Sequence, residues 1–142
     1  MRRVTRARGS IAAAVWDYGD RMRMLRLFWD AAVFLNPEVE TLDEKHMLLC
    51  RAGELRNLWE QEGLENVEER PLEANLEFAS FEDFWSPFLL GQGPAGAYVK
   101  RLAPEQVAAL REELRRRLGP ASQEPFPLPA RAWAVRGTAG RQ

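Results

Sequence analysis

The stretch "RGSIAAAVWDY", residues 8–18, decides the predicted fold. Arg8-Gly9-Ser10 has the composition of a turn, and Ile11 to Trp16 form a continuous apolar run that ends at Asp17. A short apolar run between turn signals is typical of a strand buried on both faces, as in a parallel sheet with helices on either side. Because alanine is a poor strand former, a helix over the same residues stays an alternative.

Helical patterns follow at several places along the chain. Residues 21–36 are apolar nearly all round, so this helix needs cover on most sides or must line a pocket, and Asn36-Pro37 ends it. Capping-box spacing predicts helix starts at Thr41 and at Ser80. Residues 53–63 form a further amphipathic segment, with Gly63 placed to end it.

The clearest helical pattern is "APEQVAALREELRRRLGP", residues 103–120. Proline stands at its first turn and Gly119-Pro120 at its end. One face carries the apolar residues Val107, Leu110, Leu114 and Leu118. The spacing predicts i,i+4 ion pairs on the other face, Glu112 with Arg116 and Glu113 with Arg117.

Two further segments have strand character. Residues 64–78 read as a strand near a sheet edge with a bend at Pro71, and residues 126–136 alternate as a last strand would. The order of strand, helices, strand, helices, strand is typical of an α/β layered fold. Three strands make a thin sheet, and a first strand of central character lacks neighbours on both sides.

The hexapeptide "GQGPAG", residues 91–96, matches the G-x-G-x-x-G pattern of phosphate-binding loops. That function requires a strand before the loop and an acidic residue about 20 positions later at a strand end. Here the preceding segment is a predicted helix, Pro94 removes a backbone N–H, and Glu112 lies mid-helix. We therefore expect residues 91–96 to form a flexible helix-to-helix loop and not a cofactor loop.

Composition restricts the class of protein. A chain of 142 residues suits one domain, and 20 basic against 21 acidic residues give a net charge of −1, which attracts neither nucleic acid nor anionic lipid. Cys50 is the only cysteine, so no internal disulfide and no cysteine-rich metal site is expected. The apolar runs are too short to span a membrane. We expect a cytoplasmic protein with no metal, nucleic-acid or membrane partner.

Four phrases in order resemble the C-terminal half of class I S-adenosylmethionine-dependent methyltransferases, of a bacterial small-molecule group. The phrases are "MRRVTRARGSIAAAVWDY" (1–18), "MRMLRLFWDAAVFLNPE" (22–38), "FWSPFLLGQGPAGAYV" (84–99) and "ARAWAVRG" (130–137). The resemblance implies a Rossmann-like fold in which Ile11–Trp16 is the fifth strand and residues 64–78 the sixth. Residues 126–136 would be an antiparallel seventh strand inserted between them.

The resemblance implies that residues 1–142 are a single partial domain. The segments that hold the cofactor in that family have no counterpart here, so no residue is assigned to cofactor binding. S-adenosylmethionine is expected for the complete family enzyme and not for this chain alone. Met1 would lie inside the helix before strand five, so a longer natural product stays open.

The resemblance also implies a substrate side, formed by the helical insertions at about 21–50 and 80–103. Candidate substrate-binding residues are Trp16, Tyr18, Phe28, Trp29, Trp85, Phe88 and Gln92, with Phe84 beside them. Asp17, at a strand end, is the candidate catalytic residue because a carboxylate there orients a substrate hydroxyl or amine or accepts its proton.

Each candidate has a structural alternative. The aromatic residues at helical spacing fit a packed core, and Asp17 fits a turn or cap. His46 fits a surface or packing role, and Cys50 a buried inert thiol.

Two functions stay open. The first is methyl transfer from S-adenosylmethionine to an unknown small molecule, for which this chain alone is not competent. The second is a non-catalytic interaction protein. An unpaired first strand would then join a second copy as a homodimer, or a partner that supplies the N-terminal half.

Overall fold

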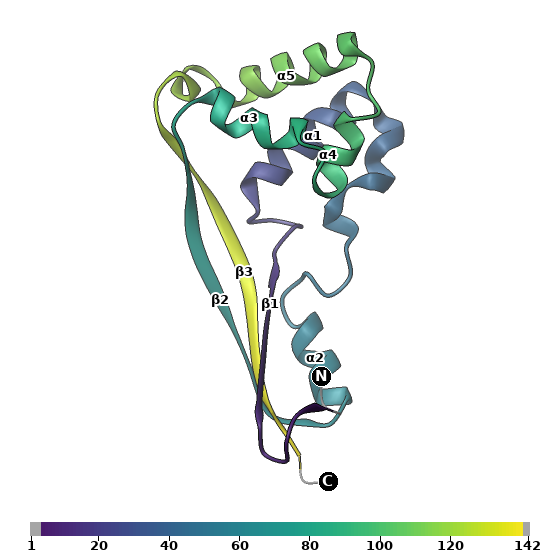
Figure 1. Cartoon of the computed structure of the whole chain (residues 1–142), viewed down its shortest axis with the longest axis vertical. Helices are drawn as coiled ribbons and strands as arrows, with labels where there is room; N and C mark the ends of the chain where they lie inside the picture. Colours follow the sequence, from purple (N-terminus) through teal and green to yellow (C-terminus); the bar gives the residue numbers. More distant parts are fainter. Residues whose placement is uncertain (1–3, 141–142) are drawn as a thin grey trace.

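The computed structural model describes residues 4–140. In chain order the elements are β1 (Ser10–Trp16), α1 (Arg23–Leu35), the 3-10 helices η2 (Pro37–Leu42) and η3 (Glu44–His46), α2 (Glu54–Gln61), β2 (Leu64–Phe78), α3 (Phe81–Leu89), α4 (Gly93–Val99), α5 (Pro104–Leu118), the 3-10 helix η4 (Pro120–Gln123) and β3 (Phe126–Ala139). In Figure 1, α1, α3, α4 and α5 gather at one end of the strands, and α2 lies at the other end. The fold is mixed α/β, as expected.

The three strands form one sheet in the order β1-β3-β2. β3 is antiparallel to both neighbours, so β1 and β2 run parallel to each other. The prediction that the last strand lies antiparallel between the other two is confirmed, and β3 continues beyond residue 136 to Ala139. The helical alternative for Ile11–Trp16 is wrong.

The prediction that β1 is buried on both faces is wrong for the described residues. Its burial alternates, with Ile11 buried and Ala12, Ala14 and Trp16 exposed. Among the described residues β1 has one neighbouring strand, the antiparallel β3, so it lies at the edge of the sheet. Alternate burial follows because only one face of a strand is covered at this edge.

The helices cover opposite faces at the two ends of the sheet. At its start β3 buries Phe126, Leu128, Ala130 and Ala132, of which Phe126 and Leu128 join the main core below the helices. Farther along, the buried residues are odd-numbered and no longer even-numbered: Val135, Gly137 and Ala139. Val135 packs with Ile11 of β1 and with Leu55 and Trp59 of α2. Successive residues of a strand point to opposite faces, so the cover changes face between Ala132 and Val135.

The main core is rich in aromatic side chains. Phe28 and Trp29 of α1 and Phe84 of α3 are fully buried, with Leu110 and Leu114 of α5. Phe28 stacks on Phe88 with ring centroids 4.5 Å apart and meets Trp29 edge-on at 5.2 Å. These are favourable geometries for aromatic pairs, so the rings supply both burial and orientation.

Two of the predicted helix and turn signals need correction. Thr41 lies inside η2, and Asp43 caps η3 by accepting a hydrogen bond from the Lys45 N–H at 2.9 Å. The predicted bend at Pro71 does not coincide with a break in pairing, because Pro71 pairs in register with Trp133 and the irregularity in β2 lies between Glu65 and Glu68. Other signals are confirmed. Ser80 caps α3 by accepting from the Asp83 N–H at 3.3 Å, and Gly63 follows α2 with a positive φ of 74°.

The flexible loop expected over residues 91–96 is also wrong. α4 already begins at Gly93, so the connection from α3 is short. A Cβ on Gly96 would lie 2.7 Å from the backbone carbon of Gly91, which no side chain tolerates. This glycine is therefore explained by the close approach of two backbone segments and not by a ligand.

The α5 helix carries one of the two expected ion pairs. Glu113 accepts hydrogen bonds from Arg117 Nε and from Arg116 Nη2, each at 2.7 Å. Arg116 thus bonds Glu113 and not Glu112. The hydrogen bond from Arg116, helped by that from Arg117, lowers the pKa of Glu113 to about 2 against the opposing effect of burial.

Replacing Phe84 with alanine is expected to lower the free energy of unfolding by about 3–5 kcal/mol, because a buried ring is lost and a cavity remains. Leu90→Ala is the matched control, since Leu90 is 70% exposed. Urea denaturation followed by tryptophan fluorescence measures both. Equal effects of the two substitutions would show that the aromatic cluster is not the core.

Glu113→Gln is expected to destabilise the chain at neutral pH and to have progressively less effect under acid. The folded pKa of about 2 lies below the unfolded value of about 4.3, so the stabilisation is complete above that value and is lost as pH falls toward 2. Thermal unfolding at several pH values tests this, with the exposed neighbour substitution Glu112→Gln as control. A constant difference from pH 7 to pH 2 would contradict the assignment.

Candidate functional site

A hollow of about 350 Å³ lies at the C-terminal end of β1. Its walls come from the turn after β1, from η3 and the segment between η3 and α2, and from β3. The charged and polar lining residues are Asp17, Asp20, Lys45, His46, Arg51 and Arg131. The structure thus brings Asp17 and His46, two residues singled out from the sequence, to one surface.

Asp17 is held in place by Arg131. Its side chain accepts a hydrogen bond from Arg131 Nε at 2.8 Å, and its own N–H donates to the Arg131 carbonyl at 2.9 Å. Asp17 Oδ1 also accepts from the Asp20 N–H at 3.2 Å. Asp17 is 4% exposed. These contacts give it a structural part in the turn, and its contact with a substrate stays a prediction.

Arg131 extends this network across the hollow. It donates to Asp20 at 2.9 Å, and its guanidinium carbon lies 4.7 Å from the centre of the Trp133 ring. Stacking on an aromatic face and bonding to carboxylates are both favourable for a guanidinium. This part of the lining is therefore a layer of paired charges.

The opposite wall carries more exposed groups. His46 Nε2 lies 3.3 Å from Glu40 Oε1. Lys45 Nζ forms ion pairs with Glu40 at 2.5 Å and with Asp43 at 3.5 Å. The hydrogen bond to Glu40 raises the pKa of Lys45. The local sequence could not predict that His46 and Asp17 line the same hollow, because the turn after β1 and the helix η3 are far apart in the chain.

A buried polar cluster anchors this wall to α1. Arg26 donates to both carboxylate oxygens of Asp43, at 3.1 Å for Nη1 to Oδ2, and Trp29 Nε1 donates to Glu44 Oε2 at 2.9 Å. Burial raises the pKa of Glu44, although the bond from Trp29 opposes it. The sequence signal for this cluster was Arg26 in a helix of apolar character, and its partners were missed.

The predicted aromatic site residues do not gather at the hollow. Phe28, Trp29, Trp85 and Phe88 pack against one another or their neighbours in the main core, with ring centroids 4.5–5.9 Å apart. Their burial agrees with the packing alternative, and a substrate contact by them stays a prediction. Gln92 is exposed between α3 and α4.

Trp16 and Tyr18, the neighbours of Asp17 in the sequence, do not line this hollow. Trp16 ends β1 and is 41% exposed on the sheet face that α2 does not cover. Tyr18 is half-buried, and its pKa is raised, chiefly by burial and then by Glu44.

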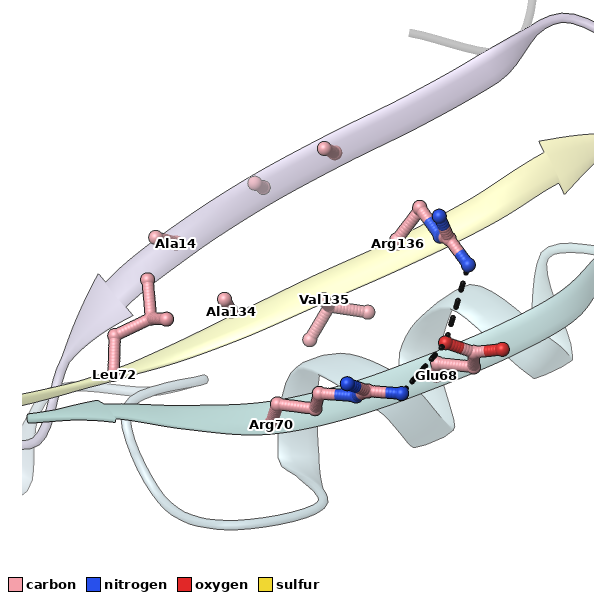
Figure 2. Close-up of a pocket in the computed structure, with 9 residues that line it drawn as sticks. Ala14, Glu68, Arg70, Leu72, Ala134, Val135 and Arg136 are labelled. Carbon is pink, nitrogen blue, oxygen red and sulfur yellow. Dashed lines mark hydrogen bonds and ion pairs between the residues drawn. The ribbon is translucent and has the colours of Figure 1, made fainter.

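That uncovered sheet surface is a second candidate site, here named the open face. It consists of the even-numbered residues of β1 with their neighbours on β3 and β2, and Figure 2 shows its alanines, Leu72 and a charged end. A hollow of about 550 Å³ lies there over Ala12, Ala14, Ala134 and Leu72. An adjoining hollow of about 380 Å³ includes Trp16 and Ala74.

The charged end of the open face is internally paired. Glu68 Oε2 lies 3.2 Å from Arg136 Nη2 and 3.8 Å from Arg70 Nη2 (Figure 2). The rest of the face is apolar, with Leu72 more than half exposed. Sequence reasoning missed this surface because it depends on which sheet face each helix covers.

The described residues do not fit S-adenosylmethionine at residues 91–96. The segment follows helix α3 and not a strand, and the backbone of Gly91 fills the space beside Gly96. A phosphate or methionine cradle needs backbone N–H groups open to the ligand.

Over residues 4–140, no helix combines the length and the apolar character needed to cross a membrane.

Asp17→Asn is expected to lower the free energy of unfolding by about 1–3 kcal/mol, because Arg131 loses its charged, buried acceptor. Asp20→Asn is the matched control, since its side chain is 71% exposed, and an effect within about 0.5 kcal/mol is expected. Calorimetric melting of both variants measures this. A larger loss of unfolding free energy in Asp20→Asn than in Asp17→Asn would show that Asp20 is the main partner of Arg131.

Comparison with known proteins assigns the chain to no family: no protein-family model matches the sequence, and no curated protein sequence matches it significantly.

Proposed function

We propose that this chain supplies the substrate-binding side of a class I S-adenosylmethionine-dependent methyltransferase that acts on a small molecule. The strand arrangement is the observation that carries the proposal. β3 runs antiparallel between two strands that are parallel to each other, which is the order the resemblance implies for strands five, seven and six. A complete Rossmann-like sheet is part of the proposal.

In this proposal the acceptor molecule binds in the hollow at the C-terminal end of β1. Ligands of α/β proteins bind at the carboxyl ends of the strands, and the hollow has that position. Asp17 and Arg131 form a hydrogen-bonded ion pair in its lining. Asp20 and His46, whose side chains are exposed, orient the acceptor group or take its proton.

Polypeptide segments other than residues 4–140 would then bind the cofactor. The short α3–α4 connection is packed on itself and leaves no space for a cofactor beside Gly96. The isolated chain is therefore expected not to bind S-adenosylmethionine.

The test uses the native protein, captured from its source cells through an epitope tag fused after Gln142, because most of the C-terminal peptide lies inside the central strand β3. Intact mass is measured, and the captured protein is photo-crosslinked to radiolabelled S-adenosylmethionine. We expect a complete species, larger than 16.3 kDa or with a partner chain, that takes up the label.

The purified 142-residue chain serves as the control and is expected to stay unlabelled. A captured species that consists of this chain alone and takes no label would overturn the proposal. Saturable labelling of the isolated chain would overturn the assignment of cofactor binding to other segments.

The open face supports a second candidate, a non-catalytic interaction protein. An exposed apolar sheet surface beside an unpaired strand edge is a common feature of protein interfaces. This candidate needs no cofactor, and it is distinguished from the first by the labelling of the captured protein.

A further inference from the structure

The outer edge of β1 presents unpaired backbone groups. Asp17 donates its N–H to Arg131, and Gly9 accepts from the Ala139 N–H at 2.9 Å, so the odd-numbered residues of β1 bond to β3. In an antiparallel ladder the alternate residues point the other way. Ser10, Ala12, Ala14 and Trp16 therefore direct their N–H and C=O groups away from β3, where the described residues provide no further strand.

The two edges of the sheet are protected very differently. β2, at one edge, carries a register irregularity between Glu65 and Glu68, a proline at position 71, and charged side chains along its length. These are devices that prevent a strand edge from pairing with another chain. β1, at the other edge, has no charged residue, no proline and no register irregularity. The fold therefore blocks one edge and leaves the other open.

The sequence of β1 is nearly self-complementary about Ala13. Ile11 and Val15 are β-branched residues two positions on either side of it, and Ala12 and Ala14 are its direct neighbours. If two copies pair antiparallel about Ala13, Ile11 faces the partner's Val15 and Ala12 faces the partner's Ala14. β-branched cross-strand pairs are among the favourable ones.

The hydrogen-bond pattern agrees with this register. In it every even-numbered residue faces an even-numbered residue of the partner, and these are the residues whose backbone groups point outward. A register shifted by one residue would oppose outward-pointing to inward-pointing groups and lose the ladder. The side chains at positions 10, 12 and 14 are small and exposed, so they add little bulk beside this edge.

We propose that the 142-residue chain forms a two-fold symmetric dimer by antiparallel pairing of β1 with β1 of a second copy, centred on Ala13. The pairing makes one continuous sheet of both copies, and the two open faces lie on the same side of it. A two-fold interface requires one surface that is complementary to itself, which the near-palindrome of β1 supplies. The inference concerns the isolated chain and does not rest on the proposed methyltransferase function.

Sedimentation equilibrium of the purified chain, from micromolar to submillimolar concentration, tests the dimer. The average mass is expected to rise from 16.3 kDa toward twice that value. A double variant, Ala12→Lys with Ala14→Lys, places like charges opposite each other twice and is expected to weaken association about tenfold. The matched variant Ala12→Lys with Ala14→Glu places opposite charges there and is expected to keep it.

Both positions are exposed, so the variants are expected to fold, which circular dichroism checks. A chain that is monomeric throughout overturns the proposal, because the edge then has another occupant or none. A dimer that is equally strong in the two double variants also overturns it, because the interface then lies elsewhere.

A cysteine crosslink tests the register itself. In a Cys50→Ser background, Ala13→Cys places the two thiols at the symmetry axis, as a non-hydrogen-bonded pair with Cα atoms about 4.5 Å apart, within the disulfide range. Mild oxidation is expected to link the copies. Ser10→Cys in the same background faces the partner's Trp16 and is expected not to link. Equal linkage at both positions would overturn the register.

Discussion

The simultaneous pairing of β3 with β1 and β2 is the constraint on which the rest of the structure depends. β3 is the last element of the chain, and it pairs Ser10 with Thr138 at one end and Phe78 with Phe126 at the other. Neither β1 nor β2 has another strand partner among residues 4–140. Such non-local pairing means that the sheet cannot form until nearly the whole chain is available.

The length of β3 also explains why the chain has two cores. Fourteen residues extend well beyond the width of one helical layer, so one end lies below α1, α3 and α5 and the other lies against α2. Since α2 packs on the opposite face, each end of the sheet is covered on one side. The open face is the consequence. Ala134 and Leu72 lie on the same face as the helical layer but beyond its end, and α2 covers the opposite face.

Periodicity and end signals predicted most of the elements because they depend on residues close in sequence. The segments that became β1, α1, α2, β2, α3, α5 and β3 were all recognisable, and the capping of α3 by Ser80 follows from a spacing of three residues. The misread segments depend on distant partners. The helix start predicted at Thr41 is displaced because Asp43, which is held by Arg26 of α1, caps η3 instead. The loop expected at 91–96 is instead the start of α4, and Gly96 packs directly on the backbone of Gly91. The pairing of Asp17 with Arg131 required the sheet order, which came only from the family resemblance.

The methyltransferase proposal and the dimer proposal both require the outward backbone N–H and C=O groups of β1. In the proposed methyltransferase, β1 is an interior strand, and a neighbouring strand of the cofactor-binding segments occupies the outward N–H and C=O groups of Ala12 and Ala14. In the dimer, a second copy of β1 occupies them. A backbone group bonds one strand at a time, so the two assemblies exclude each other. Completion of the enzyme would thus dissolve the dimer, and the dimer would hold this edge closed to other chains until the cofactor-binding segments displace it.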